Sequence, residues 1–325
     1  MQTRLVAAAL LLAAGGAGAG WVLSAPDPLP GARFAGPAMT RTGPDGLPAA
    51  APDFTPDPER GATLFAVAGC ASCHIAPAGE AGGEGAGEGA EPDAPPRLAG
   101  GKRFETAFGT FVAPNISPHE TDGIGAWSSR QFADAVLRGI GPEGAHLYPA
   151  FPYASYAKLT VGDALDMFAY LGTLPPVEGA APGHELGFPF NIRRGLGLWK
   201  RLYLSGEWVV AAEDPQVTRG RFLVEGPGHC AECHTPRDPL GGLDRSRWLA
   251  GAPNPDGPGQ VPDITPRGLS WSEADIAYYL ESGFTPDYDS VGGSMVEVVE
   301  NLAALPPEDR AAIAAYLKAV PTPAE

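Results

Sequence analysis

The chain shows one pattern of apolar and polar positions twice, in the same order. Each copy opens with an aspartate and a proline, Asp57-Pro58 and Asp214-Pro215, which is typical of a helix N-cap and first helical position. A Trp-Ser pair later in each copy predicts another helix start, followed by apolar residues on one helical face. Those faces consist of Phe132, Ala135 and Val136 in the first copy and of Ile276, Tyr279 and Leu280 in the second.

Both copies also close alike. Gly139 and Gly283 are placed to end the helices just described, and each copy finishes with an apolar helix, at residues 167–171 and 313–317. The same order of parts, twice over, predicts two tandem homologous domains. The two domains are expected to cover residues 56–178 and 211–325.

The N-terminus has the pattern of an export segment. A single positive side chain, Arg4, precedes an apolar stretch from Leu5 to Leu23 that is long enough to cross a bilayer as a helix. Residues 1–25 are therefore predicted to be a signal or a membrane anchor. A cleaved soluble form is the alternative, because residues 17–19 offer a small-x-small cleavage site. In either case we expect a periplasmic protein, held at the inner membrane if the segment is kept.

Three further segments lie outside the repeated pattern. Residues 26–55 are rich in proline and glycine and are expected to be a linker that holds the first domain away from the anchor. The Gly/Glu/Ala tract at residues 78–91 has no periodic apolar face, which predicts a surface loop. Residues 179–210 are too apolar for a free linker, so we expect them to pack across both domains, with a helix at residues 193–204.

All four cysteines lie in two copies of a Cys-x-x-Cys-His run, at residues 70–74 and 230–234. In this signature both thiols add to the vinyl groups of one haem, and the following histidine binds its iron. Four thiolates around one zinc ion are the alternative, but zinc does not require a histidine after each pair. We therefore expect two covalently bound haem c groups. The residues involved are Cys70, Cys73 and His74 for haem 1 and Cys230, Cys233 and His234 for haem 2.

The charge balance is acidic. There are 22 lysines and arginines against 38 aspartates and glutamates, which gives a net charge of −16. Such a surface repels nucleic acid and favours a partner with a basic docking face. Charge therefore excludes a nucleic-acid-binding function and leaves a protein partner open.

These features resemble class I cytochrome c domains, and the whole chain is similar to the dihaem cytochromes c that serve periplasmic dehydrogenases. The resemblance rests on the two haem runs and on residues 96–100, 114–118 and 146–153. It implies an all-α fold of two tandem class I cytochrome c domains with long loops, preceded by the N-terminal signal or anchor helix. It also implies an electron-transfer protein, not an enzyme. Electrons would come from a periplasmic dehydrogenase subunit and leave to a downstream cytochrome or terminal oxidase.

The resemblance also implies ligands. A carbonyl near Pro96 is expected to accept a hydrogen bond from His74 and so orient that ring. The second domain has Arg247 at the matching place, which leaves the corresponding bond of His234 open. Met295 lies where the methionine that completes haem 2 is expected, and a thioether ligand raises the potential of a haem.

Haem 1 departs from this pattern. Relatives carry a methionine at the position of Phe151 or of Leu159, and this chain has one at neither position. His146 and Met167 are the candidate sixth ligands, although Met167 aligns with the packing face of the terminal helix. A five-coordinate iron is the third possibility, and it would suit a peroxidase-like dihaem enzyme, which is the alternative function. Without methionine, haem 1 is expected to have the lower potential and to lie upstream of haem 2.

Overall fold

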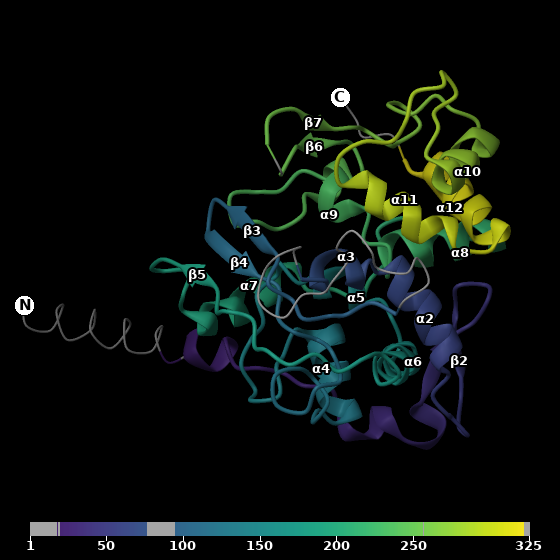
Figure 1. Cartoon of the computed structure of the whole chain (residues 1–325). Coiled ribbons are helices and arrows are strands. Elements are labelled where there is room, and N and C mark those ends of the chain that lie inside the picture. The colour runs from purple at the N-terminus through teal and green to yellow at the C-terminus, as the bar shows by residue number, and fades with distance from the viewer. Residues whose placement is uncertain (1–17, 19, 77–94, 256, 322–325) are drawn as a thin grey trace, which may run out of the picture.

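The fold contains two closely packed helix pairs, one in each half of the chain (Figure 1). We call residues 58–171 lobe 1 and residues 215–319 lobe 2. The computed structural model describes residues 18, 20–76, 95–255 and 257–321. The tract at residues 78–91 and most of the apolar stretch that begins at Leu5 lie outside the described residues.

The two helix pairs are built alike. Each brings a glycine of its first helix, Gly61 or Gly220, against the backbone of its second helix. A Cβ at Gly61 would overlap the carbonyl group of Asp166, and one at Gly220 would overlap that of Ala312. Only glycine permits this close approach, which explains the Arg-Gly pair in both halves. The pairs are α2 (Pro58–Val67) with α6 (Val161–Leu171) and α8 (Pro215–Glu225) with α12 (Pro307–Ala319).

The predicted helix starts are confirmed. The Asp57 carboxylate accepts hydrogen bonds from the first amides of α2, and that of Asp214 does the same for α8. Capping boxes begin α4 (Ser129–Arg138) and α10 (Glu273–Ser282), and glycines at positive φ end both helices. The shorter helices are α3 (Cys70–His74), α5 (Tyr153–Tyr156), α7 (Leu196–Tyr203), α9 (Ala231–His234) and α11 (Met295–Ala303).

The expectation of an all-α fold is only partly right, because the described part of the chain also forms three small antiparallel sheets. Their strands have two to four residues each, too short to show a period of two in the sequence. The strands are β1 (Thr40–Thr42) with β2 (Pro48–Ala50), β3 (Arg103–Thr106) with β4 (Gly109–Val112) and β5 (Glu185–Leu186), and β6 (Ala252–Pro253) with β7 (Gln260–Val261).

The prediction that residues 26–55 are a spacer is wrong. They form two 3-10 turns, η1 (Gly31–Phe34) and η2 (Gly36–Ala38), and the β1–β2 hairpin, and they pack on lobe 1. Arg41 forms an ion pair with the buried Asp166 at 2.7 Å, and Thr42 donates to Asp163 at 2.5 Å. The content of proline and glycine could not reveal this packing, because the contacts join residues more than 100 positions apart in the chain.

Residues 179–210 lie against both lobes, as their apolar content suggests. A 3-10 turn, η3 (Arg193–Gly195), leads into α7. On one side the ammonium group of Lys200 donates to the carbonyl groups of Arg138 and Gly139 at the end of α4. On the other side the indole of Trp199 donates to the Leu240 carbonyl, and the Tyr203 hydroxyl donates to Asp238.

The hydrophobic core runs without a break from one lobe to the other. Leu64 and Leu165 of lobe 1 belong to the same buried cluster as Phe222, Leu223 and Tyr316 of lobe 2. The two lobes therefore share one interior.

Among the residues that the structure describes, no helix is both long and apolar enough to span a membrane.

Candidate haem sites

Each Cys-x-x-Cys-His run forms a short helical turn, α3 in lobe 1 and α9 in lobe 2. Helical spacing brings the second cysteine and its histidine next to the first cysteine, as attachment to one porphyrin requires. No disulfide joins the cysteines. Within the described residues, no three His, Cys, Asp or Glu side chains cluster in a way that could hold a metal ion, so the zinc alternative has no site there.

The two histidines are held in the same way. Nδ1 of His74 lies 2.8 Å from the Pro114 carbonyl oxygen, and Nδ1 of His234 lies 2.8 Å from that of Pro262. Because a carbonyl can only accept, Nδ1 carries the proton in both rings, which leaves the Nε2 lone pair for iron. Burial lowers the pKa of both imidazoles, which favours the neutral form that a metal needs. Both turns therefore fit a haem iron.

The expectation that a carbonyl near Pro96 orients His74 is wrong, and so is the doubt about His234 that rested on Arg247. The acceptors are the first prolines of the matching Pro-x-Ile-x-Pro loops, at residues 114–118 and 262–266. The repetition of these loops in the sequence was the signal that could have found them. Pro96 instead starts the run that leads to Gly100, whose amide donates to the His74 carbonyl.

A second set of backbone bonds holds each loop in place. Gly100 and Gly251, both at positive φ, donate to the carbonyl groups of His74 and His234 at 2.7 and 2.8 Å. A non-glycine residue at either position would be strained. The backbone on the histidine side of both sites is thus the same.

The segments that follow the glycines at the ends of α4 and α10 differ between the lobes. Backbone bridges join Ile140 to His146 in lobe 1 and Phe284 to Ser290 in lobe 2, in the same register. Continuing this register by five residues places Phe151 at the position of Met295. Met295 is the half-buried first residue of α11, and Phe151 is a half-buried residue just before α5. Lobe 1 therefore has the aromatic ring of Phe151 at the position that corresponds to the thioether of Met295 in lobe 2.

The two other candidate ligands for haem 1 are both buried. Nε2 of His146 lies 2.9 Å from the Ser24 carbonyl oxygen, and the side chain is 3% exposed. Met167 lies on α6 in the hydrophobic core, 2% exposed. Ser290, the counterpart of His146 in the register just described, cannot serve as a strong iron ligand. The register singles out Phe151 and not His146 or Met167.

The two attachment turns touch each other. Nε2 of His229, the residue before Cys230, donates to the carbonyl oxygen of Ala68, two residues before Cys70, at 3.2 Å. The buried Tyr156 hydroxyl donates to the same oxygen at 3.1 Å. His229 has a φ of 37° where lobe 1 has Gly69 at 57°. Such a conformation in a histidine is strained, which indicates that the surrounding contacts hold it there.

Further contacts tie each turn to the other lobe. Asn301 of α11, the helix that starts with Met295, donates to the Ser72 hydroxyl inside the first Cys-x-x-Cys-His run at 3.2 Å. In return, Ser155 of α5 donates to Glu232 inside the second run at 3.2 Å. Sequence patterns did not reveal these contacts, because they join residues with no local relation.

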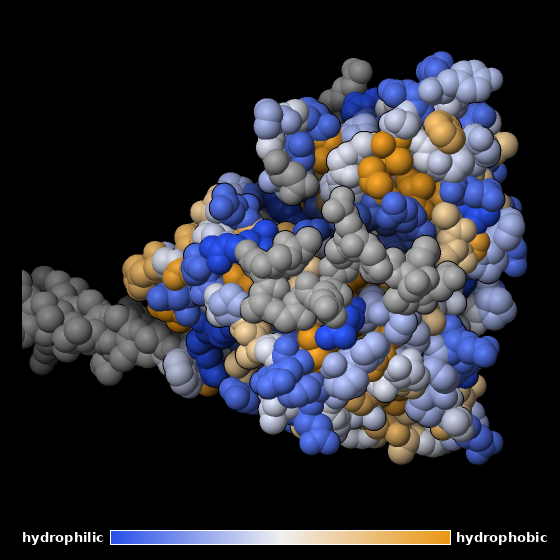
Figure 2. All heavy atoms as spheres, viewed as in Figure 1, coloured by the Kyte–Doolittle hydropathy of each residue, from blue (hydrophilic) through white to orange (hydrophobic). Residues whose placement is uncertain are grey.

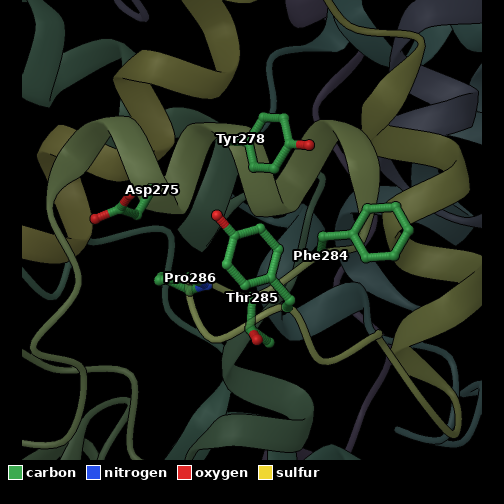
Figure 3. Close-up of a pocket in the computed structure, with 6 residues that line it drawn as sticks. Asp275, Tyr278, Phe284, Thr285 and Pro286 are labelled. Carbon is green, nitrogen blue, oxygen red and sulfur yellow. The ribbon is translucent and has the colours of Figure 1, made fainter.

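A surface pocket lies beside α10 (Figure 3). No residue of either attachment turn lines it. The side chains that line it are Asp275, Tyr278, Phe284, Thr285, Pro286 and Tyr288.

Comparison with known proteins agrees with this geometry. The family model described as cytochrome c matches residues 58–175. The "Diheme cytochrome c-type" protein of Cereibacter sphaeroides is 53% identical over 269 residues, which cover 82% of this chain and 87% of that protein.

Dehydrogenase subunits are also similar. The fructose dehydrogenase cytochrome subunit of Gluconobacter japonicus is 38% identical and covers 86% of this chain. The cytochrome c subunit of the quinone alcohol dehydrogenase of Gluconacetobacter polyoxogenes is 32% identical and covers 81%. This chain spans only 55% and 56% of those two relatives. Two histidine-bearing turns of one geometry, together with these matches, show that the chain belongs to the cytochrome c family of electron-transfer proteins, which bind haem c covalently.

Proposed function

We propose that this chain is a dihaem electron carrier made of two tandem class I cytochrome c domains. The repeated helix pairs, the matching proline carbonyls and the two attachment turns support one haem per lobe. When bound, the haems would carry the electrons, and no side chain would need to act as an acid, base or nucleophile. The residues of the chain set the distance, orientation and exposure of the two groups.

The hydrogen bond from His229 to Ala68 is the observation that carries this proposal. It joins the residue next to Cys230 to the segment just before Cys70, so both attachment turns lie at one internal boundary of the protein. Tyr156 packs between them, with its ring 5.8 Å from that of His229. Groups attached on both sides of such a boundary are close enough to exchange electrons within the chain.

The coordination that we propose differs between the lobes. His234 and Met295 complete haem 2, whereas His74 binds haem 1 and Phe151 occupies the opposite position. A thioether raises the potential of haem 2, so haem 1 would have the lower potential and receive electrons first. The chain would thus move electrons in one direction.

The partners and the location are also part of the proposal. The names of the relatives support a dehydrogenase subunit as electron donor, and the net charge of −16 suits a basic docking face on that partner. A downstream cytochrome or terminal oxidase would accept the electrons. We place the protein in the periplasm, with the apolar stretch from Leu5 to Leu23 as its anchor in the inner membrane.

Mass and potential test this function. Intact mass of the denatured protein should show two added haem groups. Cys73→Ala should disturb the attachment of haem 1 only, and the matched variant Cys233→Ala should disturb that of haem 2 only. A redox titration should show two separate waves, the lower one lost with the Cys73 variant. A single added haem, or a lower wave that follows Cys233, contradicts the proposal.

One observation favours a second function. Phe151 leaves the sixth position of haem 1 without a strong ligand, as a peroxidase-like dihaem enzyme would require. Cyanide or peroxide binding to haem 1, with turnover of peroxide by a reduced donor, would establish that function. A haem 1 that binds neither ligand supports the carrier.

A further inference from the structure

The face of the molecule around α7 combines exposed apolar side chains with arginines. We propose that this face, which we call the α7 face, rests on the anionic surface of a lipid bilayer. Its apolar side chains stand out into solvent, with Phe188 81% and Leu202 68% exposed. Figure 2 shows apolar atoms gathered at this end of the molecule, beside the start of the described chain. The face consists of Trp21, Val22, Phe188, Ile192, Leu198 and Leu202.

The end of the apolar N-terminal stretch packs directly against this face. Ser24 is buried, and its carbonyl group lies so close to Gly197 that a Cβ on that glycine would overlap it. Nε of Arg194 donates to the Ser24 hydroxyl at 2.9 Å, and Nε of Arg201 donates to the Leu23 carbonyl at 2.8 Å. If the stretch is anchored in a membrane, as the proposed function holds, α7 must lie at the membrane surface.

Charge points to anionic lipid as the occupant. Arg193, Arg194 and Arg201 lie within nine residues of a chain whose net charge is −16. The Arg194 guanidinium lies 4.3 Å from the ring centre of Trp21, and tryptophan beside arginine is the usual composition of a membrane interface. Basic residues beside an anchor attract anionic headgroups, and their apolar neighbours enter the interface.

Acidic side chains near the face do not cancel this charge. Glu185 is paired with Arg103 at 2.7 Å, and Asp27 is paired with Arg138 at 2.6 Å. Lys200 points inward to the end of α4 and does not contribute to the surface. Asp238, which accepts a hydrogen bond from Tyr203 of α7, is a further acidic neighbour, and the three arginines of the face outnumber it.

Docking of this face would fix the orientation of the whole protein. Lys200 joins α7 to lobe 1 through two hydrogen bonds, and Trp199 and Tyr203 join it to lobe 2. A body held both by its anchor and by α7 cannot turn freely above the membrane. The two haem lobes would then present constant surfaces to their partners.

Spin labels on the full-length holoprotein test the proposal. Leu202→Cys and Phe188→Cys place labels on the α7 face, and Glu308→Cys places a matched control on α12, at the other end of the molecule in Figure 1. In vesicles of phosphatidylcholine with phosphatidylglycerol, the first two labels should be shielded severalfold from an aqueous nickel relaxation agent relative to the third. Adding Arg201→Gln should lower the ratio of docked to undocked protein about fivefold, because a lysine or arginine near such a surface contributes about 1 kcal/mol.

The outcomes separate this proposal from the proposed anchorage. Protein that resists an alkaline wash but leaves all three labels equally accessible to nickel overturns docking and keeps the anchor. Protein that washes off the vesicles contradicts the anchor and also contradicts docking of the α7 face on the membrane. Shielding that appears only after a dehydrogenase is added would make the face a protein interface and would also overturn the proposal.

Discussion

Lobes 1 and 2 agree on one side of their haem sites and differ on the other. On the histidine side, both have a proline carbonyl 2.8 Å from Nδ1 and a glycine amide that binds the histidine carbonyl. In the segments that follow Gly139 and Gly283, lobe 1 has Phe151 at the position where lobe 2 has Met295. The comparison teaches that the backbone around the two histidines is built alike, while the side chain at this second position differs between the lobes.

The lobes also differ in how their helix pairs are joined. In lobe 1, Asp166 accepts from both Arg41 and Arg60, and its carboxylate is fully buried. In lobe 2, Arg219 alone pairs with Asp309, which is also largely buried. The additional arginine, Arg41, comes from the hairpin β1–β2, which packs on lobe 1. Lobe 1 is therefore bound to the segment that leads to the predicted anchor.

Exchange of Phe151 and Met295, the proposed residues at the sixth positions, should have the largest effect. We expect Phe151→Met to raise the potential of haem 1 by about 0.2 V, since axial ligands control a range of roughly 0.8 V. Met295→Phe should lower the potential of haem 2 by a similar amount. Redox titration monitored by absorbance measures both waves. If Phe151→Met leaves the lower wave in place, Phe151 does not face the iron.

Alanine at the glycines of the helix contacts should destabilise both lobes alike. Gly61→Ala and Gly220→Ala each place a methyl group against a carbonyl of the facing helix, which should cost about 3 kcal/mol of unfolding free energy. Gly195→Ala is the matched control, because a Cβ there meets no atom within 4 Å. Urea denaturation of the holoprotein measures the loss. Equal stability of all three variants would mean that the helices are farther apart than the structure shows.

Neutralising the buried aspartates should lower the free energy of unfolding more in lobe 1 than in lobe 2. Asp166→Asn removes the carboxylate that Arg41 and Arg60 share, although Arg60 keeps its ion pair with Asp163, and should cost about 4 kcal/mol, within the range for breaking a buried pair. Asp309→Asn leaves one arginine and should cost about half of that. Thermal unfolding of both variants at one pH compares them. A larger loss with Asp309→Asn would refute the view that the hairpin adds stability to lobe 1.

Removal of the His229 side chain should change stability least. His229→Gly relieves the strain of a positive φ and also breaks the bond to Ala68, so the free energy of unfolding should change by less than about 1 kcal/mol. Electron exchange between the lobes should nevertheless become slower, which flash reduction of one haem can follow. Gly69→Ala, at the matching position of lobe 1, is the control for a change in turn geometry alone. An unchanged exchange rate would exclude His229 from the route.

Several features were predictable because their causes are local. Helix starts at Asp57, Asp214, Ser128 and Ser272 follow from a side chain that accepts bonds from amides two or three residues away. The helix over residues 193–204 was also expected, and the structure has α7 at Leu196–Tyr203 after the turn η3. The three small sheets were missed, because their strands are too short to leave a pattern.

By itself, the sequence determined the chemistry. Two thiols and a histidine within five residues suffice for attachment to a haem, and the repeat of that run and of its helices required two similar halves. Tertiary structure alone decided which proline orients each histidine, that residues 26–55 lie on lobe 1, and that His229 reaches Ala68. These contacts join residues from 28 to 161 positions apart, and packing and hydrogen bonds over such separations depend on the folded shape and not on neighbouring side chains.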